Sequence, residues 1–169
     1  MEDVRHVSVF AQGTSPELAP LVLLHGTGGR ETDLMPFAEE IAPGRSRLGM
    51  RGTVEIAGGY AFFERYADRR VNEADLAKRA PGLTRSITTL LELNHMQRRP
   101  IVVGFSNGAI AATAILHTVG DLFAGAVLLR SLRPFETGPQ KRLDSTPVLI
   151  IDAQHDDRRL PDGAPLGGG

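Results

Sequence analysis

Residues 100–112, PIVVGFSNGAIAA, constrain the fold of this chain more than any other stretch. A β-branched run (101–103) leads directly into Gly-Phe-Ser-Asn-Gly (104–108) and then into an alanine-rich segment. The apolar run predicts a buried parallel strand, and the alanines predict a helix. A strand, a Gly-x-Ser-x-Gly turn and a helix in this order form a nucleophile elbow, in which the serine has a strained backbone. The stretch therefore predicts an α/β fold with Ser106 at a strand–helix junction.

Each residue of the elbow has an expected role. Small residues are needed two positions before and after the serine, and Gly104 and Gly108 meet this need. The backbone N–H of Asn107, at the start of the helix, is predicted to face the oxyanion that forms during acyl transfer. Ser106 is the predicted nucleophile. The alternative is an ordinary strand-to-helix turn with a solvated serine.

The rest of the chain alternates expected strands with expected helices. Strands are expected at 4–10, 21–24, 46–50, 123–129 and 147–151. Helices are expected at 34–41 and 72–96, the second broken or kinked near Pro81-Gly82. Residues 52–59 are expected to be irregular, and 130–146 to be a loop. This alternation predicts a mostly parallel sheet with helices on both faces, whose ligands bind at the carboxyl ends of the strands.

The composition excludes several classes of protein. With 169 residues, 41% hydrophobic content and a formal net charge of -1, the chain is expected to be a soluble single domain spanning 1–169. The sequence has no basic patch of the kind that would indicate nucleic-acid binding, and it has no apolar run long enough for a membrane span. The absence of cysteine excludes disulfides and thiolate metal ligands. A metal site and a cofactor are not expected, and the N-terminus indicates a cytoplasmic protein.

A glycine-rich loop, HGTGGRE (25–31), follows the strand expected at 21–24. Position 31 is glutamate where a dinucleotide-binding fingerprint needs glycine, and no Gly-Lys-Ser/Thr follows as in a phosphate-binding P-loop. The remaining interpretation is an oxyanion loop, with the backbone N–H of Thr27 as the second donor. The alternative is a glycine turn without a catalytic role. His25 is predicted to be a structural loop histidine rather than a general base.

Several motifs in the same order resemble the bacterial carboxylesterase/phospholipase-like family of α/β-hydrolases. These are LHGTGGRETD (24–33), RG (51–52), FFERY (62–66), EADL (73–76) and GFSNGA (104–109). The resemblance covers residues 21 to about 161 and implies an eight-stranded α/β-hydrolase fold that acts on carboxylic esters as a serine esterase. It also implies a triad acid after the seventh strand, in a Gly-x-x-Asp context. AQHD (153–156) matches with alanine in place of glycine, so Asp156 is the candidate acid, with Asp152 and Asp157 as rivals.

The triad of this fold follows the order serine, acid, histidine, and no histidine follows Asp156. The chain is therefore expected to lack the C-terminal segment that carries the base. The base is absent, supplied by another chain, or replaced by His25 or His155. The favoured function is a serine ester hydrolase, and the alternative is a catalytically impaired remnant that serves as a binding or interaction module. An unpaired sheet edge beside 147–151 predicts possible self-association.

Overall fold

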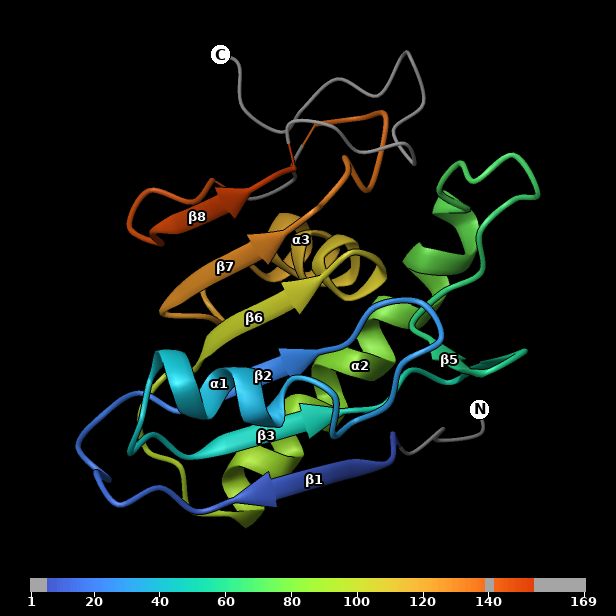
Figure 1. Ribbon diagram of the computed structural model, residues 1–169. Helices are drawn as coiled ribbons and strands as arrows, with labels where there is room; N and C mark the ends of the chain where they lie inside the picture. Colours follow the sequence, from blue (N-terminus) through green and yellow to red (C-terminus); the bar gives the residue numbers. More distant parts are fainter. Residues whose placement is uncertain (1–5, 139–141, 154–169) are drawn as a thin grey trace.

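The computed structural model describes residues 6–138 and 142–153, which form a twisted main sheet with helices on both faces (Figure 1). In spatial order its strands are β1 (Ser8–Ala11), β3 (Arg47–Met50), β2 (Leu21–Leu24), β6 (Ile101–Phe105), β7 (Gly125–Leu129) and β8 (Val148–Ile151). Only β1 pairs with its neighbour in antiparallel orientation. The predicted α/β-hydrolase architecture, mostly parallel with helices on both faces, is confirmed.

The register of the parallel strands brings the two conspicuous loops of the sequence together. Leu24 at the end of β2 pairs with Gly104 of β6, and Gly104 pairs with Leu128 of β7 on its other side. The glycine-rich loop after Leu24 and the elbow after Phe105 therefore leave the sheet at one edge, where the arrowheads point the same way in Figure 1. Ligand sites of parallel sheets lie at this edge.

Helices cover the two faces of the sheet unequally. Helix α1 (Met35–Ile41) packs on one face, and α2 (Glu73–Leu93) and α3 (Asn107–Val119) pack on the other (Figure 1). The larger hydrophobic core lies between the sheet and the α2–α3 layer, where residues 107–116 of α3 are all buried. Alanines at four of these positions let α3 approach the sheet closely, which places the start of α3 firmly against the strands.

Helix α2 is one helix with Pro81 inside it, so of the two forms expected near Pro81-Gly82, a break or a kink, the break is wrong. Proline removes one helical hydrogen bond and glycine has low helix propensity, which is why the sequence predicted an interruption there. A stripe of buried side chains at helical spacing runs through the whole helix on both sides of Pro81: Leu76, Ala80, Leu83, Ile87 and Leu91. Burial of this stripe in the core outweighs the local penalty, since tertiary packing provides most helical stability in proteins.

Residues 52–61 also differ from the expected irregular stretch. They contain a hairpin of two three-residue strands, β4 (Val54–Ile56) and β5 (Gly59–Ala61), joined by a turn in which Gly58 has φ 91°. Strands this short carry no detectable alternation in the sequence, so the hairpin depends on its tertiary contacts. One such contact is a bridge between Gly29 and Tyr60, which joins the hairpin to the glycine-rich loop.

The C-terminal part of the described sheet follows the prediction. Residues 130–138 and 142–147 contain no helix or strand, and β8 lies parallel to β7 at the edge of the described sheet. Leu149 and Ile151 are 54% and 50% exposed. Self-association through this edge stays a prediction. No helix in the described part of the chain is long and apolar enough to cross a membrane.

Candidate active site

Ser106 occupies the strained turn that the sequence predicts. It is the N-cap residue of α3, directly after β6, and its backbone angles are φ 50° and ψ -111°. Its N–H donates to the carbonyl oxygen of Leu129 at 2.8 Å, and its own carbonyl oxygen accepts from Ile110 N–H at 3.0 Å. A non-glycine residue in this region costs about 1 to 3 kcal/mol, so the surrounding structure must hold it there. Such strain is typical of functional positions.

The two glycines of the elbow are required by close backbone packing. A Cβ atom on Gly104 would lie 2.6 Å from Ala109 Cα, and one on Gly108 would lie 2.1 Å from the carbonyl oxygen of Leu24. Both distances are far shorter than any normal contact. The small residues therefore let α3 begin directly above the ends of β2 and β6, as the sequence predicts.

Asn107 holds the chain after the β4–β5 hairpin through its side chain, a role that the sequence analysis missed. The side chain is fully buried; Oδ1 accepts from Phe62 N–H at 2.7 Å, and Nδ2 donates to the Phe63 carbonyl oxygen at 3.3 Å. As the first residue of α3, Asn107 has a backbone N–H without a partner inside the helix. The side chain thus fixes the neighbouring segment, and the role of the backbone N–H as an oxyanion donor stays a prediction. The sequence signal nearest to this contact is FFERY (62–66), one of the motifs that carry the resemblance.

The glycine-rich loop is held by β5. Gly28 N–H donates to the Tyr60 carbonyl oxygen at 2.9 Å, and Tyr60 N–H donates to the Gly29 carbonyl oxygen at 3.1 Å. Gly28 has φ 83°, which glycine adopts readily. Thr27 is exposed and lines a cleft of about 360 Å³ together with Asn107, Phe63 and Arg65. The structure therefore brings together Thr27 and Asn107, two of the predicted site residues, from loops that are eighty residues apart.

His25 uses both ring nitrogens in structural hydrogen bonds. Gly52 N–H donates to Nε2 at 3.0 Å, and Nδ1 lies 2.7 Å from the Gly26 carbonyl oxygen. Because Nε2 accepts, the proton must be on Nδ1, which makes the ring neutral. Burial lowers the pKa of His25 and favours the same state. These bonds support the structural interpretation of His25, because a base role would require one nitrogen to give up its partner.

The structure describes only some of the predicted candidates for the triad acid and base. Asp156, its rival Asp157 and the base candidate His155 lie outside the described residues. The third acid candidate, Asp152, follows β8 at the same edge of the sheet as the elbow. Among the described histidines, none hydrogen-bonds the Ser106 side chain. The described histidines are His6, His25, His95 and His117, and Nδ1 of His6 contacts the Arg51 carbonyl oxygen. No cluster of three or more potential metal ligands occurs in the described part of the chain.

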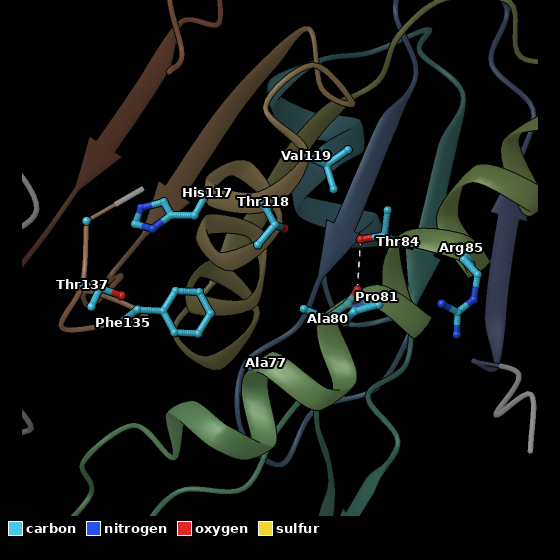
Figure 2. Close-up of a pocket in the computed structure, with 11 residues that line it drawn as sticks. Ala77, Ala80, Pro81, Thr84, Arg85, His117, Thr118, Val119, Phe135 and Thr137 are labelled. Atoms are coloured by element: carbon cyan, nitrogen blue, oxygen red, sulfur yellow. Dashed lines mark hydrogen bonds between the residues drawn. The ribbon is translucent and has the colours of Figure 1, made fainter. Parts of the chain in front are cut away.

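A larger pocket, about 490 Å³, lies between α2, α3 and residues 135–138 (Figure 2). His117, Thr118 and Val119 contribute to it from the last turn of α3, whereas Ser106 is at the first turn. Eleven residues of helix separate Ser106 from His117, which corresponds to roughly 16 Å. His117 is therefore on the wrong end of α3 to act on the serine, and we place the candidate active site at the smaller cleft.

An ion pair ties the glycine-rich loop to the segment after β3. Arg51 Nε and Nη2 donate to the two carboxylate oxygens of Glu31 at 2.5 and 2.7 Å. The guanidinium carbon of Arg51 lies 4.6 Å from the centre of the Tyr60 ring, so β5 also contributes to this contact. The hydrogen bonds from Arg51 lower the pKa of Glu31 to about 2. The pair therefore fixes the loop that carries Thr27.

This ion pair predicts a pH-dependent contribution to stability. A carboxyl group whose pKa is lowered by folding stabilises the folded state above its ordinary pKa, 4.5, and loses that effect as the pH falls toward about 2. We expect Glu31→Gln to lower the free energy of unfolding at pH 7, and the difference from the wild type to shrink below about pH 5. Urea denaturation of both proteins at pH 7 and pH 3 measures this. A difference that is equal at both pH values would contradict the assignment.

Comparisons with known proteins agree with the fold. No protein-family profile matches the chain. The chain is 35% identical over 149 residues to MhqD of Bacillus subtilis (strain 168), a protein named as a hydrolase; the match covers 88% of this chain and 74% of MhqD. The crystal structure of a Bacillus cereus carboxylesterase superposes with a TM-score of 0.87 at 30% identity, covering 94% of this chain and 78% of the carboxylesterase. A carboxylesterase from Mesorhizobium loti shares the fold, with a TM-score of 0.81 at 24% identity over 89% of this chain and 72% of its own.

Proposed function

Because this chain belongs to the carboxylesterase/phospholipase-like family of α/β-hydrolases, we propose that it hydrolyses carboxylic esters through an acyl-enzyme at Ser106. The chain is a hydrolase of the esterase type. The observation that carries the finer proposal is the strained backbone of Ser106 at the start of α3, beside the cleft that Thr27 and Asn107 line. A serine in this position is presented to a ligand rather than packed into the turn.

In the proposed reaction, Ser106 Oγ attacks the ester carbonyl carbon and its proton passes to a general base. The carbonyl oxygen becomes an oxyanion, which accepts hydrogen bonds from the backbone N–H groups of Asn107 and Thr27. The dipole of α3 also favours negative charge at this point. The tetrahedral intermediate releases the alcohol and leaves the acyl group on Ser106. Water then attacks this acyl-enzyme by the same steps and releases the acid.

Asp156 is the proposed acid that orients the base, with Asp152 and Asp157 as rivals. His25 is disfavoured as the base because both its ring nitrogens are hydrogen-bonded to the backbone. His155 is then the remaining candidate within this sequence, and a histidine from another chain is the other proposed source. The mechanism needs no cofactor or metal ion, since the serine, the base and the oxyanion donors carry out every step.

The histidine hydrogen bonds also favour a second candidate function. Because no described histidine hydrogen-bonds Ser106, the chain alternatively serves as a hydrolase-like binding or interaction module. A serine without a base is a weak nucleophile, and a hydrolase that lacks one retains only a small residual rate.

A fluorophosphonate probe distinguishes the two functions. We expect the probe to label the wild-type protein and not Ser106→Ala, because the phosphorus atom reacts with an activated serine hydroxyl. Mass spectrometry of the labelled protein locates the adduct, and the hydrolysis of 4-nitrophenyl butyrate measures turnover. A folded wild-type protein that is neither labelled nor active would favour the binding module.

A further inference from the structure

The cleft lined by Asn107, the residue that follows Ser106, contains a positively charged side chain to which the proposed reaction assigns no role. Arg65 lines this cleft together with Thr27 and Asn107, the proposed oxyanion donors. Its position is set by Asn107, whose side chain hydrogen-bonds the backbone of Phe62 and Phe63 just before it in the chain. A backbone bridge to Val71 holds Arg65 from the other side. The backbone at Arg65 is therefore held on both sides, and one of these contacts comes from the elbow residue Asn107.

Arg65 is poorly satisfied for a half-buried arginine. Among the described residues, its guanidinium makes one hydrogen bond, from Nη2 to the Arg69 carbonyl oxygen, and its Nε is buried without a partner. Burial, followed by the nearby charge of Arg69, lowers the pKa of Arg65. Arginine nevertheless stays charged at neutral pH, so the site holds a cation with unused donors.

Neighbouring arginines show what Arg65 lacks. Three of them make ion pairs with carboxylates: Arg51 with Glu31, Arg70 with Asp68, and Arg79 with Asp75. A planar guanidinium binds a carboxylate through parallel hydrogen bonds, which is its strongest common contact in proteins. No described carboxylate pairs with Arg65, so its unused donors are open to an anion from outside this part of the chain.

Two acidic residues of the cleft restrict which anion fits. Glu55 and Glu64 also line it, and both are exposed. Their charges weaken the attraction of the cleft for a free anion, even though they do not neutralise Arg65 directly. The carboxylate that binds Arg65 is thus expected to be tethered to a group that is already held at the serine. The acyl group fits this condition, since it stays on Ser106 through both halves of the reaction.

We propose that the substrates are esters whose acyl group ends in a carboxylate, and that Arg65 binds this carboxylate while Thr27 and Asn107 hold the ester carbonyl. This inference rests on the proposed function and adds the class of substrate to it. Hydrolysis consumes one water and releases the alcohol and a dicarboxylic acid. Arg65 takes no part in the bond changes and determines specificity.

Turnover of two matched esters tests the proposal. Monoethyl succinate and ethyl butyrate differ only in a terminal carboxylate against a methyl group, and acid release measures both. We expect Arg65→Gln to lower kcat/KM for monoethyl succinate about 10- to 100-fold, and to change the value for ethyl butyrate less than about threefold. Arg65→Lys should retain part of the preference because it keeps the charge. Arg69→Gln is the control, since it removes a neighbouring charge from outside the cleft.

A binding measurement separates this inference from the proposed function. Calorimetry with Ser106→Ala should show that monoethyl succinate binds at least about tenfold more tightly than ethyl butyrate, and that adding Arg65→Gln removes the difference. Equal binding of the two esters by Ser106→Ala overturns the inference, whether or not the wild type cleaves either one. If the wild-type protein neither hydrolyses the esters nor is labelled by the probe, and Ser106→Ala keeps the binding preference, the result speaks against the serine mechanism and supports the anion site.

Discussion

Gly108→Val is expected to lower the thermal midpoint of unfolding by roughly 6 to 12 °C, more than Ser106→Ala does. Valine introduces a Cβ that would lie 2.1 Å from the Leu24 carbonyl oxygen and 2.5 Å from that of His25. Both atoms belong to the backbone at the end of β2, so relief requires α3 to move away from the sheet. Such overpacking costs about 3 kcal/mol, which corresponds to this shift for a chain of this size.

Two variants serve as controls for Gly108→Val. Ser106→Ala removes a hydroxyl without adding bulk, and we expect its midpoint to stay within about 3 °C of the wild type. Gly138→Val adds the same side chain where a Cβ would meet no atom within 4 Å, so it should be nearly neutral. Calorimetry or circular dichroism gives the midpoints. Equal midpoints for Gly108→Val and Ser106→Ala would show that the close packing of the elbow is unimportant for stability.

Replacement of Thr27 by proline is expected to lower kcat for ester hydrolysis by about 10² to 10³, the usual effect of losing one oxyanion donor. Proline has no backbone N–H, and in the proposed mechanism this N–H is the contribution of Thr27. The threonine side chain is exposed at the cleft and has no proposed role. Thr27→Ala should therefore retain most of the activity.

Backbone changes other than the loss of the donor must be excluded for Thr27→Pro. The loop is held at Gly28, Gly29 and Tyr60 by backbone hydrogen bonds that do not involve the N–H of Thr27. We therefore expect the thermal midpoint to change little, while kcat falls. Equal rates for Thr27→Ala and Thr27→Pro would remove Thr27 from the oxyanion site.

The sequence by itself determined the architecture and the elbow. The β-branched run before Gly104 and the alanines after Gly108 have local preferences that agree with their tertiary environment. The predicted strand, turn and helix are therefore present, and Ser106 has the expected strained backbone. The alternation of strands and helices along the chain likewise predicted the parallel sheet, because parallel strands need crossover connections. These features depend on residues that are close in sequence, where side-chain periodicity is informative.

Only the tertiary structure decided the features that depend on distant partners. Helix α2 continues through Pro81 because its buried stripe packs on the core, which outweighs the local preference. His25 is tied to Gly52, and the side chain of Asn107 to Phe62 and Phe63, across 27 to 45 residues of chain. The guanidinium of Arg65, which has no carboxylate partner among the described residues, was equally invisible in the sequence, where it is one of many charged residues. A hydrogen bond or an unsatisfied donor is a relation between atoms in space, and sequence periodicity carries no information about it.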